Sequence, residues 1–201
     1  MARSLEFCFD FISPYSYIAV HALPKYLEGT DFTVDYRPIF LGAVMKGSDN
    51  RPPGLVPAKG AYMQKDILRS CARYGIGFRM HPGFPMMNTR PCLRIACALE
   101  GEPDTQSAFI RTVFHHVWAA ETPLQTDDMA AVKAVCDAAG LDGERLAGLA
   151  EDEDAKAALT KNTDSALARG AFGAPSFFVD DELYFGHDRL DYVIEALRPT
   201  A

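Results

Sequence analysis

Residues 9–17 read FDFISPYSY, and a short aromatic run stops there at a Ser-Pro pair. Leu5 to Phe11 is short, rich in aromatic residues and bounded by Ser13 and Pro14, a pattern that predicts a buried strand. Serine is favoured at the N-cap of a helix, and proline at the first helical position. We therefore predict that the strand turns directly into a helix at Ser13.

The residues that follow complete a strand–helix–strand unit. Apolar side chains recur at helical spacing as far as Tyr26, and Gly29-Thr30 ends this helix. Phe32 to Tyr36 alternates between apolar and polar residues, which predicts a second strand. This order is most typical of a βαβ unit.

Residues 42–170 have a different, helical character. Helices are predicted over 61–74, 90–99, 104–118 and 126–139, with a further pair from 142 to about 168 and irregular proline-containing stretches at 50–60 and 79–91. The pattern predicts no strand in this segment. We interpret it as a long helical insertion.

The C-terminal segment returns to strands. Ser176 to Val179 and Leu183 to Phe185 flank Asp180-Asp181, which predicts a hairpin, and a helix follows to about Leu197. The two chain ends must share one sheet, because neither can bury its strands alone. The prediction is an α/β, thioredoxin-like fold (βαβ…ββα) made of residues 1–45 plus 168–201, with a helical insertion domain at 46–167.

Composition narrows the function classes. The chain has 201 residues, with 20 Lys and Arg against 27 Asp and Glu, so its formal net charge is −7. This acidic balance argues against nucleic acid or an anionic membrane as the main partner. The N-terminus does not resemble a signal peptide, and no run of apolar residues is long enough to span a membrane. We expect a soluble, cytoplasmic protein.

The cysteines predict neither a disulfide framework nor a metal site. The five are scattered, and no CxxC motif or Cys/His zinc spacing occurs. In a thioredoxin fold, the turn from the first strand into the first helix usually carries the reactive cysteine, but here Ser13 and Ser16 stand there. We therefore expect the working thiol to come from a bound molecule. The alternative is that Ser13 is only an N-cap.

Two other stretches are candidates for binding. Pro175 follows two glycines and precedes a strand, so we expect a cis bond that lets the backbone of Ala174 pair with an extended peptide. The alternative is an ordinary turn before a strand. His187 and Asp188 open a helix, where N–H groups suit a carboxylate and Asp188 suits an ammonium group. Simple capping residues would have the same appearance.

Four motifs occurring in order resemble one known family. They are FDFISPYSY at 9–17, NRPPGLVPAKG at 50–60, RGAFGAPSFFV at 169–179 and FGHDRL at 185–190. Together they resemble the DsbA-like kappa-class glutathione transferases and the bacterial 2-hydroxychromene-2-carboxylate isomerases, from about Leu5 to Leu197. The resemblance implies glutathione as cofactor, with Ser13 hydrogen-bonding its sulfur and favouring the thiolate. It also implies that Asn50 and Lys59 lie near the glycine end.

The same resemblance assigns the remaining site residues. Ala174, beside the expected cis Pro175, matches the residue whose backbone pairs with the cysteinyl portion of glutathione. Asp188 matches the residue that holds the γ-glutamyl ammonium group. His187 stands where the family has a small polar side chain, so only its backbone N–H is expected to serve.

The function implied is a glutathione-dependent isomerase of the 2-hydroxychromene-2-carboxylate isomerase type. A thiolate would add reversibly to an aromatic-catabolism intermediate and then leave. The alternative is a kappa-class transferase or peroxidase, which consumes glutathione. A thiol–disulfide oxidoreductase is disfavoured because Ser13 and Ser16 replace both sulfurs, and a non-catalytic binding module is a further alternative.

The resemblance also implies a homodimer and a small aromatic or apolar electrophile. Phe84, Met86, Met87, Phe114 and Trp118 are predicted as core, with the substrate pocket as the alternative.

Overall fold

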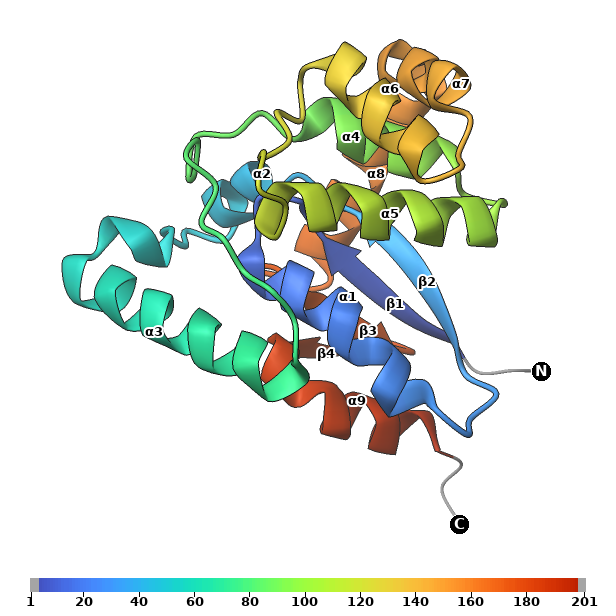
Figure 1. The fold of residues 1–201 in the computed structure, drawn as a ribbon. Helices are drawn as coiled ribbons and strands as arrows, with labels where there is room; N and C mark the ends of the chain where they lie inside the picture. The colour runs from blue at the N-terminus through green and yellow to red at the C-terminus, as the bar shows by residue number, and fades with distance from the viewer. Residues whose placement is uncertain (1–3, 199–201) are drawn as a thin grey trace.

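The computed structural model describes residues 4–198, and its centre is one four-stranded sheet with the strand order β2-β1-β3-β4. β1 (Ser4–Phe9) runs parallel to β2 (Thr33–Pro38) and antiparallel to β3 (Ser176–Val179), which pairs with β4 (Glu182–Phe185). The prediction that both chain ends form a single sheet is confirmed. Figure 1 shows the blue and red strands side by side.

The turn after β1 forms as the sequence predicts. α1 spans Pro14–Leu27, and Ser13 is its N-cap, with the Ser13 Oγ accepting a hydrogen bond from the Ser16 N–H at 3.1 Å. β1 stops at Phe9, two residues before the predicted end, because Asp10 begins the turn. Ser13 is thereby held at the end of a central strand and at the positive end of a helix.

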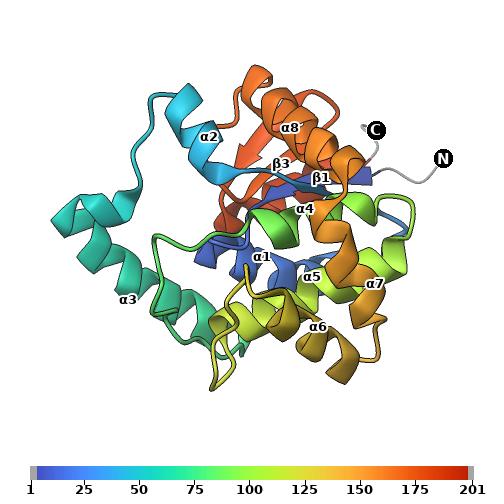
Figure 2. The ribbon, with the colours of Figure 1, turned by 90° about the horizontal axis from the view of Figure 1, so that it is seen from above.

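The segment between β2 and β3 contains helices. These are α2 (Leu41–Gly47), α3 (Pro57–Tyr74), α4 (Arg90–Ala98), α5 (Pro103–Trp118), α6 (Met129–Ala138), α7 (Gly143–Gly148) and α8 (Glu153–Ala168), with short 3-10 turns η1 (Pro53–Leu55) and η2 (Leu149–Glu151). The sequence pattern did not predict α2, and it predicted a loop over the whole of residues 50–60. In fact η1 and the start of α3 lie there, since Pro57 begins the helix. Figures 1 and 2 show α3 to one side, away from α6 and α7.

The predicted hairpin is confirmed, and its turn contains Asp180 with a positive φ of 54°. After β4, the 3-10 turn η3 (His187–Arg189) leads into α9 (Leu190–Leu197). η3 therefore places His187 and Asp188 directly after an edge strand of the sheet.

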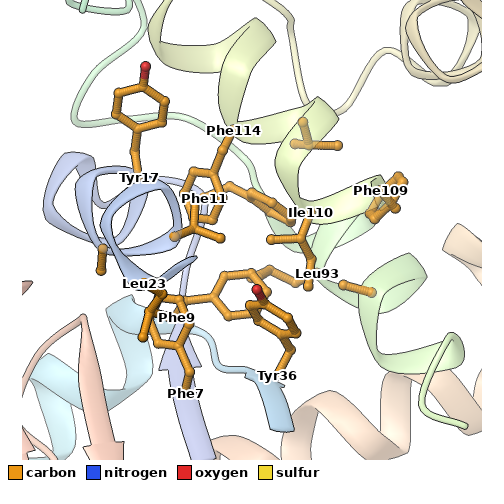
Figure 3. Close-up of a cluster of buried hydrophobic side chains, with 14 of the residues drawn as sticks. Phe7, Phe9, Phe11, Tyr17, Leu23, Tyr36, Leu93, Phe109, Ile110 and Phe114 are labelled. Carbon is orange, nitrogen blue, oxygen red and sulfur yellow. The ribbon is translucent and has the colours of Figure 1, made fainter. Parts of the chain in front are cut away.

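The central strand β1 is largely buried on both of its faces, which explains its nearly continuous apolar run, whereas the edge strands β2 and β4 are partly exposed. Phe7 and Phe9 pack with Tyr36 and Phe114 on the face covered by α1 and α5, whereas Cys8 packs on the opposite face with residues of α2 and α8. Figure 3 shows Phe9 and Phe11 pointing toward Phe114 of α5. No helix within residues 4–198 is long and apolar enough to cross a membrane.

Candidate active site

Ser13 and Ala174, predicted separately from the sequence, meet at the start of α1. The Ser13 side chain is buried, and its Oγ donates a hydrogen bond to the carbonyl oxygen of Ala174 at 2.9 Å. The Ala174–Pro175 peptide bond is cis, as predicted. A hydroxyl donor and the backbone at the entry of β3 are therefore adjacent.

The turn that carries Ser13 is fixed by Asp10, a residue that the sequence analysis did not assign. Asp10 is fully buried, and its carboxylate accepts hydrogen bonds from Ile12 N (3.1 Å), Leu41 N (2.9 Å) and Thr89 Oγ1 (2.6 Å). Burial raises the pKa of the Asp10 carboxyl, and these donors act in the opposite direction. Asp10 thus ties the Ser13 turn to α2 and to the segment before α4. An acidic residue within an aromatic run was the only sequence signal.

An apolar cavity of about 170 Å³ opens beside Ser13. Its walls come from the Ser13 turn, α2, η1, α3 and the 84–85 segment, and include Ile12, Leu41, Met45, Met63, Phe84 and Pro85.

Trp118 and Phe114 lie in the core as predicted, both fully buried. Phe84 instead lines this cavity while contacting Trp118 edge-to-face at 5.8 Å between ring centroids. The prediction for Met86 was wrong, because its side chain is 88% exposed.

A second, wider cavity of about 530 Å³ adjoins the first and shares Tyr15, Met45, Met63 and Ala174 with it. Asn50, Arg51 and Lys59 line this second cavity. The Asn50 Nδ2 donates to the carbonyl oxygen of Phe172 at 2.8 Å, which ties the segment before η1 to the segment that carries Ala174. The structure therefore brings the predicted Asn50 and Lys59 to the same side of Ser13.

A third cavity, of about 250 Å³, contains His187 and Asp188 together with Asp66, Arg69, Ser70 and Arg73 of α3. The His187 ring is buried, lies 2.9 Å from the Ser70 Oγ through its Nε2, and has its pKa lowered by desolvation. Asp188 is exposed and pairs with the Arg189 guanidinium at 2.7 Å. The His187 side chain is thus a packed wall of the cavity, whereas the Asp188 carboxylate is open to a ligand.

Tyr15 links the three cavities, and the sequence analysis gave it no role. Its ring lines the first two cavities and stacks on His187 of the third, at 5.1 Å between centroids and 11° between planes. Its hydroxyl donates to Asp66 Oδ2 at 3.0 Å. Burial and this carboxylate raise the pKa of the Tyr15 phenol. Tyr15 therefore orients the Ser13 turn against α3 and η3.

The thiols of the chain itself are unsuited to nucleophilic chemistry. All five cysteines are free and buried. Burial raises the pKa of Cys8 and Cys97 to about 12, and the pKa of Cys71 and Cys136 to about 11. Cys92 is fully buried, and its pKa is raised as well. Since the thiolate is the reactive form of a thiol, none of these five side chains is a nucleophile for the Ser13 site.

Comparison with known proteins agrees with this geometry. The profile of the DSBA-like thioredoxin domain matches residues 4–198, and the chain belongs to this family. It is 30% identical to a 2-hydroxychromene-2-carboxylate isomerase of Sphingobium xenophagum, over 96% of this chain and 97% of that one. It is equally identical to glutathione S-transferase kappa 2 of Caenorhabditis elegans, over 97% and 92% of the two chains.

A solved structure of a 2-hydroxychromene-2-carboxylate isomerase superposes with a TM-score of 0.84 and 26% identity, covering 96% of this chain and 94% of that one. The thioredoxin-like fold and the relationship to both enzyme groups are thereby confirmed. The relatives are enzymes of two kinds, an isomerase and a transferase, which match this chain at the same identity.

Proposed function

We propose that this protein is a glutathione-dependent isomerase in which Ser13 stabilises the cofactor thiolate beside an apolar substrate cavity. The observation that carries the proposal is the Ser13 hydroxyl, a donor positioned 2.9 Å from the Ala174 carbonyl at the wall of that cavity. Isomerases are among the relatives of the chain, one at 30% identity and a solved one with a TM-score of 0.84.

The donor and acceptor groups of the three cavities suit glutathione. Lys59 and Asn50 offer a cation and an amide for the glycine carboxylate. The Ala174 backbone offers an N–H and a carbonyl for the cysteinyl portion. Asp188 offers a carboxylate for the γ-glutamyl ammonium group, and Arg69 and Arg73 line the same cavity. These are the complements that a tripeptide with separated charges needs.

Ser13 can supply enough free energy to favour a thiolate. Lowering a thiol pKa from about 8.5 to about 6.5 requires roughly 2.7 kcal/mol. A hydrogen bond to a charged acceptor supplies about 1.5–3 kcal/mol, and the N-terminus of α1 supplies about 0.3–2 kcal/mol. In the structure the Ser13 proton is donated to the Ala174 carbonyl, so the hydroxyl has to turn from that carbonyl to the sulfur, while the Ser16 N–H still donates to the Ser13 Oγ. No general base is needed.

When bound, glutathione supplies the thiolate that adds reversibly to a conjugated carbon. The chain holds the electrophile against the apolar walls and donates the Ser13 proton in a hydrogen bond to the sulfur. The second candidate is a kappa-class transferase, favoured by the kappa 2 relative at the same identity. Following total thiol during turnover separates the two, because an isomerase leaves it constant and a transferase lowers it.

The test of the proposal is glutathione binding by calorimetry, followed by turnover of Ser13→Ala. Ser16→Ala is the matched control, since the Ser16 Oγ is buried and has no hydrogen-bond partner within the described residues. We expect binding in all three proteins and a loss of turnover in Ser13→Ala alone. Absence of glutathione binding, or full turnover by Ser13→Ala, would contradict the proposal.

We further propose a cytoplasmic homodimer, which native mass spectrometry and cell fractionation can check.

A further inference from the structure

The cavity beside Ser13 is lined entirely by uncharged groups. Its walls are formed by aliphatic, methionine, proline and phenylalanine residues, with Ser13 and Tyr15 as the two hydroxyl-bearing side chains. Neither hydroxyl is available to a carboxylate. The proposed function assigns the Ser13 proton to the thiolate, and the Tyr15 hydroxyl already donates to Asp66.

Cationic side chains line the two other cavities of the site. Arg51 and Lys59 line the cavity that the proposed function assigns to the glycine carboxylate, and Arg69 and Arg73 line the one assigned to the γ-glutamyl group. On the Tyr15 side, the charged group next to the apolar cavity is the Asp66 carboxylate, 3.0 Å from the Tyr15 hydroxyl. Its negative charge disfavours a second anion there.

We infer that the electrophile is uncharged, an aromatic or apolar conjugated carbonyl compound without a carboxylate. An unpaired carboxylate is strongly disfavoured when it leaves water for an apolar cavity, whereas an apolar ring is stabilised by the same transfer. This inference rests on the proposed function and narrows its substrate class. It separates this chain from the relative whose name specifies a carboxylate.

A binding experiment tests the inference without turnover. The two probes are 4-phenylbutan-2-one and 2-oxo-4-phenylbutanoate. The carbonyl carbon bears a methyl group in the first and a carboxylate in the second, and neither compound has the reactive double bond. Calorimetry is done on the protein alone and on the protein saturated with glutathione. We expect the ketone to bind at least about 10-fold more tightly to the glutathione-saturated protein, in which the Ser13 hydroxyl and the neighbouring cations are engaged, and the protein alone is the reference. Equal or tighter binding of the keto acid would overturn the inference.

Turnover gives a second readout with the matched reactive pair, the Z isomers of 4-phenylbut-3-en-2-one and 2-oxo-4-phenylbut-3-enoate. Formation of the E isomer and loss of total thiol are followed together, and each enzymatic rate is divided by the rate with free glutathione. Isomerisation conserves all atoms, and conjugation adds the S–H of glutathione across the C=C bond. We expect the larger acceleration for the ketone, and the opposite order would contradict the inference.

A charge introduced into the wall should change this preference. Met45 lines both the apolar cavity and its neighbour and is half-buried, so an arginine there can reach a bound carboxylate. Met45→Arg is expected to shift the ketone-to-keto-acid affinity ratio at least about 10-fold toward the keto acid. The control Met45→Leu should keep the original ratio. An unchanged ratio in a folded Met45→Arg protein would count against the inference. Failure of the proposed function is recognised separately, as absence of glutathione binding.

Discussion

The Ser13 hydroxyl donates a 2.9 Å hydrogen bond to the carbonyl oxygen of Ala174, 161 residues later in the chain. This bond joins the first strand–helix turn to the entry of β3. It places a side-chain donor and a backbone peptide group at one point of the sheet, where a bound thiol tripeptide can be held by both.

Asp188→Asn should weaken glutathione binding by about 5- to 10-fold, since it removes one exposed charged partner of the ammonium group. Asp191→Asn is the matched control, because Asp191 is also exposed and lies one turn further on, in α9. Calorimetry at constant ionic strength measures both. Equal glutathione affinities of the two variants would show that Asp188 does not bind the ammonium group.

Phe84→Ala should raise the KM for an apolar electrophile by about 10-fold, because the ring forms a wall of the cavity beside Ser13. Its neighbour in the same segment, Met86, is almost fully exposed, so Met86→Ala should leave the KM unchanged. Glutathione affinity should be the same in both variants. A KM effect of equal size in Met86→Ala would contradict this assignment.

Asp10→Asn should lower the free energy of unfolding by about 1–3 kcal/mol, because an amide cannot accept all of the hydrogen bonds that the buried carboxylate receives. Thr89→Val removes only one of these donors and should cost less. Urea denaturation measures both variants. We also expect reduced turnover in Asp10→Asn, since the turn that carries Ser13 loses its anchor. Wild-type stability in Asp10→Asn would show that this network does not hold the turn.

Acidification should destabilise the protein partly through His187. Burial lowers the pKa of His187 below its unfolded value, so its neutral form is preferred in the folded state. The associated stability is present above pH 6.5 and is lost as the pH falls toward the lowered pKa, by up to about 1.4 kcal/mol per pH unit. His187→Asn should therefore show a smaller loss between pH 7.5 and 5.5 in urea denaturation.

His21 provides the comparison for that experiment. Its pKa is also lowered by burial, to about 4, so it contributes in the same direction and remains in the His187→Asn variant. A residual pH dependence is therefore expected in that variant. An identical pH dependence in the wild type and His187→Asn would contradict the role given to His187.

The parts of the fold that the sequence predicted depend on local signals. The Ser13-Pro14 start of α1, the Asp180 turn and the positions of the strands along the chain follow from capping, turn chemistry and alternation. α2 was missed because its seven residues contain two glycines and begin without a side-chain cap. Such a short helix is held by packing against α8 rather than by its own propensity.

The site was predictable only where a motif carries it. Ser13, Ala174, Asn50, Lys59 and Asp188 line three cavities on either side of Tyr15, and their roles in binding glutathione stay predictions. The network of Asp10 and the stacking of Tyr15 were not predictable, because each depends on segments far apart in the sequence. Thr89 is 79 residues from Asp10, and no local pattern indicates that they meet.

The most direct test of the central claim is the thiol pKa of bound glutathione, measured by thiolate absorbance during pH titration of the complex. We predict a pKa of about 6.5 in the wild type and in Ser16→Ala, and a return toward about 8.5 in Ser13→Ala. The same low pKa in Ser13→Ala, with glutathione still bound, would contradict the assignment of Ser13 as the group that stabilises the thiolate.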